Sequence, residues 1–425
     1  MILWNRKLLG AAKQILRHHT SLADALPDVA KATGLPIPLD SLANAFKRHG
    51  EATPASFLKP EKKRGELSPR EELYLRVQAK DRARQRRQQG MTDIILEKVD
   101  AALCKIAPDV LQVVPEPPPE DVPAGSPELL WCEVSDVQLG TRVELEKMGG
   151  LNQHDWTIFL AKLARWEEAV TATIRGRRRA APIEGVVIAM LGDIVEGHNI
   201  FKGQVYELDF DVYKQVVHGA NDFAQAFARI AATFPDLKFT LYGVGGNHGR
   251  VGSYGEAPYR CNWDLILYHI MELRLGALGL PNVICHFPQA WFQVVETWGW
   301  THLLVHGDDI KGWGGLPFYG LQRAVGKYQQ VLQKPVNYLH IGHFHAEAAI
   351  SSSLGDAIVN GNWIGANSFS KVIVEANTPV QLIHGITEKN GIEWTRKVFL
   401  RTREDMRPRI AVYRHGARRA ARGAS

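Results

Sequence analysis

The sequence has little cysteine and no long apolar stretch. Its four cysteines are widely scattered and form no CxxC pair: Cys104, Cys132, Cys261 and Cys285. This spacing excludes a disulfide framework and a zinc knuckle, and it predicts reduced core residues. No apolar run approaches the roughly 18 residues needed to cross a bilayer. Because the N-terminus is too polar after Leu9 for a signal peptide, we expect a cytoplasmic protein with no membrane partner.

Charge is distributed unevenly along the chain. Hydrophobic residues make up 45% and charged residues 23%, which is typical of a globular protein, and the net charge is +6. Eleven basic and five acidic residues lie between Lys59 and Arg87, and ten basic and two acidic residues between Arg396 and Arg422. The rest of the chain is therefore acidic. Basic appendages on an acidic body suit contact with phosphate backbones, although solvated helix faces would have the same composition.

Four regions can be distinguished along the sequence. Residues 1–50 predict a small helical domain, either a helix-turn-helix or a helical bundle without a DNA role. Residues 51–128 predict basic helices that end in a Pro-rich extended linker. The main domain is expected at 129–400, and 401–425 is a basic, Arg-rich tail.

From Leu129 onward, apolar runs alternate with long amphipathic segments. The runs LLWCEVSD, GVVIAMLGD and KFTLYGVGGNH predict strands that are covered on both faces. Helices are expected near 153–175 and 211–233, and a hairpin should turn at Lys389-Asn390-Gly391. We therefore predict an α/β fold, a four-layer α-β-β-α sandwich of two mixed sheets.

Polar residues of a kind that bind metal ions follow the predicted strands. They are Asp136, Gln138, Asp193, Asn247, His306, His343 and His345, with His248 next to Asn247. Ligands of open α/β sheets gather beyond the carboxyl ends of the strands. Side chains at positions i and i+2 of a strand share a face. This would aim Asp136 with Gln138, and His343 with His345, at one point. A single Asp-Gly or His would be an ordinary turn or core residue, but the ordered series predicts a metal site.

The series SDVQLG, LGDIVE, GGNHGR, VHGDD and GHFH resembles the calcineurin-like metallophosphoesterase superfamily. The superfamily pattern is Asp-x-His, Gly-Asp-x-x, Gly-Asn-His, a later His and Gly-His-x-His, and the match covers about 129–370. The spacing looks closest to DNA-repair exonucleases of the SbcD type and to phage-encoded relatives. Asn262, Asp264 and the later NGNWIG segment favour the phage-like branch. The resemblance implies the metallophosphoesterase fold and metal-dependent hydrolysis of phosphoesters.

The resemblance also implies two metal ions bridged by Asp193. One ion would be bound by Asp136, Gln138, Asp193 and His345, and the other by Asp193, Asn247, His306 and His343. His248 would face the scissile phosphate as the catalytic acid. The ligand set favours manganese, with iron, zinc or magnesium as alternatives.

Two departures from the superfamily pattern affect the site. Gln138 stands where the pattern usually has His, and a neutral carboxamide is a weaker ligand than an imidazole. Arg250 stands near the position where many members have an acidic residue, and it could bind a phosphate oxygen or be a surface side chain. His198 and Asn199 are further candidates for substrate binding, with a structural role in their loop as the alternative.

Three functions fit these features. The first is a DNA nuclease that hydrolyses phosphodiester bonds, with DNA as partner and with a homodimer and an ATPase partner as further expectations from the SbcD likeness. The second is a phosphatase or phosphodiesterase acting on a small molecule such as a nucleotide. The third is a DNA-binding protein without catalysis, which the nearly complete ligand set disfavours.

Overall fold

The computed structural model describes only part of the chain. The described residues are 12, 14–15, 22–33, 79–80, 112–121, 123–198, 200–252, 255–311, 316–366 and 378–401.

The chain divides into two compact units, Met1–Arg84 and Gln85–Ser425. In the first unit, helix α2 (Leu22–Thr33) buries Ala25 and Val29. It spans the first helix of the predicted helix-turn-helix, whereas the second helix lies outside the described residues. Almost all of the basic segment at 51–111 and the tail at 402–425 lie outside them as well.

The second unit is built on two mixed β-sheets. The first sheet has the strand order β11-β10-β1-β2-β3-β4, and the second has the order β5-β6-β7-β9-β8. The strands of the first sheet are β1 (Glu128–Val134), β2 (Ile183–Met190), β3 (Lys238–Gly243), β4 (Val283–His286), β10 (Val380–Thr387) and β11 (Gly391–Phe399). Those of the second sheet are β5 (Phe292–Thr297), β6 (Trp300–Val305), β7 (Tyr338–Ile341), β8 (Ala348–Ser352) and β9 (Gly355–Val359).

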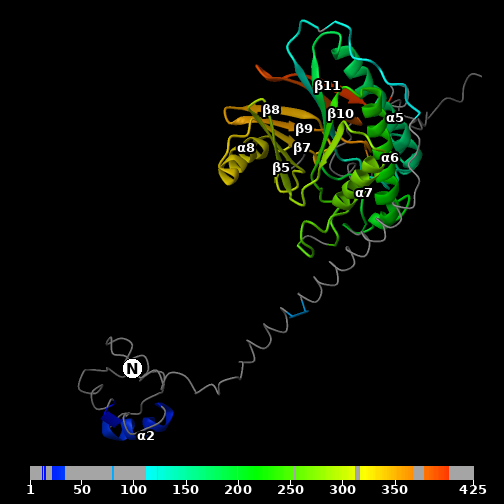
Figure 1. Ribbon diagram of the computed structural model, residues 1–425. Coiled ribbons are helices and arrows are strands. Elements are labelled where there is room, and N and C mark those ends of the chain that lie inside the picture. Colours follow the sequence, from blue (N-terminus) through cyan, green and yellow to red (C-terminus); the bar gives the residue numbers. More distant parts are fainter. Residues whose placement is uncertain are drawn as a thin grey trace, which may run out of the picture. The chain divides into compact units, whose positions relative to one another are not determined.

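Helices cover the outer face of each sheet (Figure 1). Three long helices pack on the first sheet, one helix packs on the second, and a short 3-10 helix lies in a loop. They are α5 (Trp156–Arg177), α6 (Val212–Thr233), α7 (Trp263–Ala277), α8 (Phe318–Leu332) and η2 (Gln204–Glu207). The side chains of Asp155, Asp211 and Asn262 accept hydrogen bonds from the first turns of α5, α6 and α7 and so fix where these helices begin.

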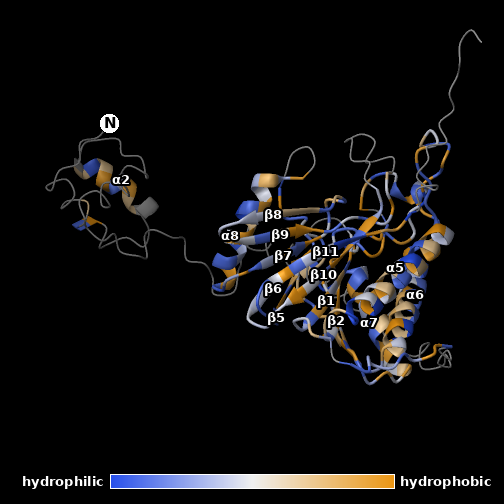
Figure 2. Cartoon of the chain, turned by 90° about the horizontal axis from the view of Figure 1, so that it is seen from above, coloured by the Kyte–Doolittle hydropathy of each residue, from blue (hydrophilic) through white to orange (hydrophobic). Residues whose placement is uncertain are grey.

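The alternation of side chains along the strands separates the core into layers. In β1, Leu130 and Cys132 pack against the helices, whereas Trp131 packs between the two sheets with Leu304 of β6. Apolar residues line α5 to α7 beside β1 and β2 (Figure 2). The predicted four-layer sandwich of two mixed sheets is therefore confirmed, and so is the hairpin, since β10 and β11 pair in antiparallel fashion.

Two further expectations can be compared with the described residues. Cys132 and Cys261 are buried and unpaired, as expected, while Cys285 is half-buried and also unpaired. Cys104 lies outside the described residues. Within the described part of the chain, no helix is both long enough and apolar enough to cross a membrane.

Candidate metal centre

Loops from both sheets meet at the carboxyl ends of their parallel strands. The loop after β1 is hydrogen-bonded to the loop after β2, with Asp136 N–H donating to Gly192 O at 3.1 Å and Gln138 N–H to Asp193 O at 2.9 Å. A Cβ atom on Gly192 would lie 2.6 Å from the backbone nitrogen of Gly246, so the loops after β2 and β3 approach closely only because glycine is present. This packing gathers the predicted ligands.

Five of the seven predicted ligands have a left-handed backbone. Their φ angles lie between 48° and 68°, and they are Asp136, Gln138, Asp193, His343 and His345. Among the described non-glycine residues, only Trp298 and Gln333 share this conformation. Such backbones cost free energy and concentrate at functional sites. The prediction that i and i+2 positions on a strand aim Asp136 with Gln138, and His343 with His345, was wrong, because all four lie in loops beyond the strand ends.

One cluster of ligand atoms forms around the His306 ring. Its Nε2 atom lies 3.0 Å from Asp193 Oδ2 and 3.0 Å from Asn247 Oδ1, while Nδ1 faces Leu191 O at 2.8 Å. An Nδ1–H that donates to Leu191 directs Nε2 at two side-chain oxygens, so either a proton on Nε2 or a metal cation must lie between them. Ligand atoms of Asp193, His306 and His343 all lie within 4.8 Å of one another and could hold a metal ion.

The protonation of this cluster is governed by burial and by Asp193. Burial disfavours the charged His306 ring, but Asp193 outweighs it and raises the pKa of His306 to about 10. Conversely, burial lowers the pKa of His343 to about 4, with the charge of His306 acting in the same direction. With no metal bound, a proton on His306 balances the Asp193 carboxylate, and a divalent cation would replace that proton.

A second cluster forms around Asp136. Both of its carboxylate oxygens lie 3.0 Å from the backbone nitrogen of His343, which fixes the loop after β7. His345 Nε2 lies 3.3 Å from Asp136 Oδ1 and 3.3 Å from Gln138 Nε2. Turning the Gln138 amide by 180° would place its oxygen at that position, which is the orientation a metal ligand requires.

His248 is held by a carboxylate that the sequence analysis did not assign. Its Nδ1 atom lies 3.1 Å from Glu196 Oε2, and its Nε2 atom lies 3.4 Å from Gln138 Nε2 and 4.0 Å from Asp193 Oδ2. Burial favours the neutral ring, but Glu196 and Asp193 outweigh it and raise the pKa of His248 to about 10. The ring is therefore a proton donor at neutral pH.

Asp264 supports the loops that carry the ligands. It is fully buried and accepts hydrogen bonds from the backbone N–H groups of Ile194, Val195 and Gly246, at 3.0, 2.9 and 2.8 Å. In the sequence, Asp264 was noted only together with Asn262, as a pattern that favours the phage-like branch. A carboxylate at the second residue of α7 carries no local signal that it joins a loop 18 residues upstream to one about 70 residues upstream.

Two polar residues near the candidate ligands hold the surrounding loops. Gln204 donates to Glu196 Oε1 at 2.7 Å and accepts from Ile200 N–H. Asn362 donates to the backbone oxygen of His345 at 2.7 Å. His198 is exposed, and Asn199 lies outside the described residues.

A cavity of about 760 Å³ opens beside His306. Arg250, Asp308, Lys311 and Trp291 contribute to its lining. Arg250 Nη1 lies 3.6 Å from Asp308 Oδ2, so the guanidinium is at the cavity but is paired with an acidic side chain.

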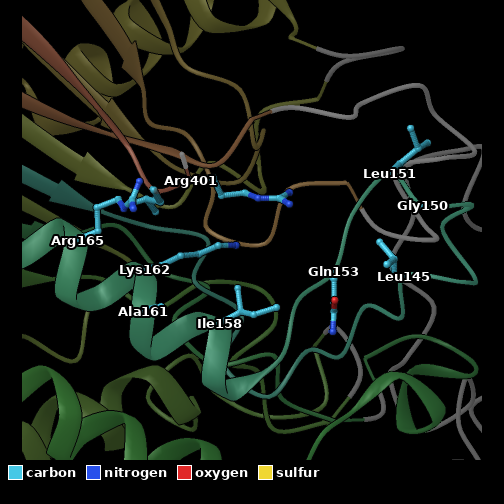
Figure 3. A pocket seen from close by; sticks show the side chains of 10 residues that line it. Leu145, Gly150, Leu151, Gln153, Ile158, Ala161, Lys162, Arg165 and Arg401 are labelled. Atoms are coloured by element: carbon cyan, nitrogen blue, oxygen red, sulfur yellow. The ribbon is translucent and has the colours of Figure 1, made fainter. Parts of the chain in front are cut away.

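A smaller pocket of about 240 Å³ has a basic lining (Figure 3). Lys162 and Arg165 extend from α5, and Arg401 comes from the segment after β11. Lys162 also donates to the backbone oxygen of Trp363. The backbone N–H of Trp363 in turn donates to the backbone oxygen of Asp136 at 3.0 Å. The pocket is thus connected to the candidate metal centre through one loop.

Several solved structures match the chain at low sequence identity and low TM-score. Vps29 from Entamoeba histolytica in complex with Zn²⁺ is 11% identical, with 64% of this chain and 99% of that chain covered and a TM-score of 0.27. An archaeal phosphodiesterase is 14% identical, with 64% and 99% covered and a TM-score of 0.31. A predicted phosphoesterase from Streptococcus pneumoniae is 9% identical, with 64% and 97% covered and a TM-score of 0.24.

No protein-family model and no curated protein matches the sequence.

Proposed function

We propose that the protein is a two-metal phosphodiesterase. The observation that carries this proposal is the convergence at His306, whose Nε2 atom lies 3.0 Å from side-chain oxygens of both Asp193 and Asn247. The left-handed backbones of the neighbouring ligand positions support it, because a strained conformation is retained where function requires it.

The residues fit two adjacent ions. Asp136, Gln138, Asp193 and His345 would hold the first, and Asp193, Asn247, His306 and His343 the second. A pair of divalent ions supplies an activated water and neutralises the charge that develops on a phosphoryl group. Carboxylate, amide and imidazole ligands together favour manganese, with iron, zinc and magnesium as alternatives.

His248 is the proton donor in this proposal. Glu196 holds the ring through Nδ1, so that Nε2 is directed at the ligand cluster, 4.0 Å from Asp193 Oδ2. A phosphodiester held beside Asp193 would receive the Nε2 proton on its leaving oxygen. Because the carboxylates keep the ring charged, the donor is ready before the substrate binds.

DNA is the proposed substrate. Basic residues between Lys59 and Arg87 and between Arg396 and Arg422 supply the positive charge that a phosphate backbone attracts. Arg165 and Arg401, which line the smaller pocket, add positive charge near the start of the C-terminal tail. The SbcD-like spacing of the motifs supports the same substrate, and with it a homodimer and an ATPase partner as further proposals.

A small phosphodiester such as a nucleotide is the alternative substrate. The cavity beside His306 favours it, because about 760 Å³ is the size of a small-molecule site and Arg250, Lys311 and Trp291 could contact a phosphate and a base.

Hydrolysis assays with the purified protein separate these proposals. The protein with Mn²⁺ is expected to cleave labelled single- or double-stranded DNA and bis-nitrophenyl phosphate, and His248→Ala should abolish both activities. Cleavage of the small ester without any DNA degradation would favour the nucleotide-like substrate. Absence of all hydrolysis with manganese, iron, zinc and magnesium in turn would refute the enzyme proposal.

A further inference from the structure

A second group of metal-binding side chains lies between the two sheets. Glu133 comes from β1, His384 from β10 and His340 from β7 of the other sheet, and all three are buried. One ligand atom from each lies within 4.8 Å of the others. His340 Nδ1 is 2.5 Å and His384 Nε2 is 3.4 Å from Glu133 Oε1. The two imidazoles thus direct one nitrogen each at the same carboxylate.

The outer nitrogens of these rings have hydrogen-bond partners. His384 Nδ1 lies 2.8 Å from Thr395 Oγ1, and His340 Nε2 lies 2.9 Å from His302 Nδ1. His302 Nε2 in turn lies 2.9 Å from Thr297 Oγ1. Both chains end on hydroxyl groups, which can donate or accept. The outer N–H groups can therefore all donate away from Glu133, which leaves the inner nitrogens as lone pairs.

The Glu133 carboxylate is fully buried and faces two ring nitrogens, with 2.5 Å between its Oε1 atom and His340 Nδ1. The Oε2 atom of Glu133 has no hydrogen-bond partner. A buried carboxylate that faces two ring nitrogens is costly unless a proton or a metal cation lies between them.

We propose that Glu133, His340 and His384 bind one zinc-like transition-metal ion between the sheets. The ligands would be the Glu133 carboxylate, including its unpaired Oε2, with His340 Nδ1 and His384 Nε2. Two imidazoles and a carboxylate are a ligand set that zinc accepts. The hydroxyl oxygens of Thr395 and Thr297, which end the two series of hydrogen bonds, fix the tautomers of the rings. The cluster is closed to substrates, so the ion would join the sheets. Glu133 in β1 precedes Asp136 by three residues, and His340 in β7 precedes His343 by three residues.

Retention of zinc by the folded full-length protein tests this proposal. The chain is refolded with Zn²⁺ or with a strong chelator, and the folded protein is then exhaustively chelated before its metal content is measured. The candidate catalytic centre should lose its ions, because His248, His343 and His345 are partly exposed. The buried site should keep about one zinc per chain, which is released only when the protein unfolds in guanidinium. Zinc during refolding should also raise the melting temperature.

Two variants test the site, and a third is the control. Glu133→Gln, which keeps the shape of the side chain, and His384→Gln, which removes one imidazole, are expected to reduce retained zinc to less than about a tenth of an equivalent. The control His286→Gln changes an exposed histidine of β4 and should retain as much zinc as the wild type.

Two results would overturn the proposal. One is a wild type that retains no zinc and melts at the same temperature whichever way it was refolded. The other is a Glu133→Gln variant that retains as much zinc as the wild type. Either would mean that a proton on one of the histidines balances the carboxylate. If the variants do not fold, the two wild-type refolding arms decide the question alone.

Discussion

Glu196 and His248 form a hydrogen-bonded pair, with 3.1 Å between Glu196 Oε2 and His248 Nδ1. Glu196 is itself held by Thr141 and Gln204, whose side chains donate to its two oxygens at 2.9 and 2.7 Å. The pair therefore orients the ring and keeps it protonated at the same time. Both effects can be measured separately, since orientation changes the rate at every pH and protonation changes the pH profile.

Glu196→Gln should lower kcat by roughly 10- to 100-fold, as expected when a group that orients a functional histidine is lost. It should also shift the alkaline limb of the kcat/KM profile to lower pH. The sign follows because Glu196 raises the pKa of His248, and a proton donor loses activity as the pH rises through its pKa. The pH–rate profile is compared with that of Glu184→Gln, an equal charge change at an exposed position of β2. An unshifted alkaline limb in Glu196→Gln would argue against the pairing.

His248→Ala should reduce turnover by about 10²- to 10⁴-fold while the metal content of the purified protein stays at the wild-type level. His345→Ala is the matched comparison, because it should lose activity together with one metal ion. Mass-spectrometric metal analysis and hydrolysis of bis-nitrophenyl phosphate report the two quantities. Loss of metal from His248→Ala would make it a ligand rather than the proton donor.

Gln138→His should tighten binding of the first metal ion by about 10-fold or more, since an imidazole is a stronger ligand than a carboxamide. The Gln138 Nε2 atom lies 3.3 Å from His345 Nε2 and 3.4 Å from His248 Nε2. A histidine ring at position 138 can therefore reach the same cluster. Activity titrated with Mn²⁺ should reach half-maximum at a lower concentration. Gln138→Ala should move it in the opposite direction. If both substitutions leave the titration unchanged, residue 138 binds no metal.

Asp264→Asn should lower the free energy of unfolding by about 1–3 kcal/mol, because the amide nitrogen of asparagine cannot accept one of the three backbone hydrogen bonds. Denaturant unfolding in the presence of a chelator measures this loss independently of bound ions. Asp121→Asn, at an exposed position, serves as the control. A loss no greater than the control's would show that Asp264 does not hold the loops in place.

Deletion of residues 402–425, which contain seven arginines, should weaken DNA binding and flatten its dependence on salt. Hydrolysis of the small ester should not change, because the metal centre is retained. A version with the seven arginines changed to glutamine keeps the length and should behave like the deletion. Fluorescence anisotropy at several salt concentrations provides the slopes. Identical slopes in all three proteins would exclude the tail as a DNA contact.

The sequence predicted the α/β class, the two mixed sheets, helices α5 and α6 and the β10–β11 hairpin, because apolar periodicity and turn residues are local signals. It also selected the residues that gather around His306 and Asp136. The predicted cause of their convergence was wrong, because left-handed loop backbones, and not alternation along a strand, direct these side chains. It assigned no role to Glu196 and described Asp264 only as part of a pattern.

What the sequence determined by itself is therefore the identity of the groups: which side chains follow which strands, and which chemistry they could support. The tertiary structure alone decided their distances and charge states. Glu133 and His340 are 207 positions apart, and only the packing of β1 against the other sheet brings them within 2.5 Å. Burial and neighbouring charge, which set the pKa of His248, arise from that packing and have no signature in the local sequence.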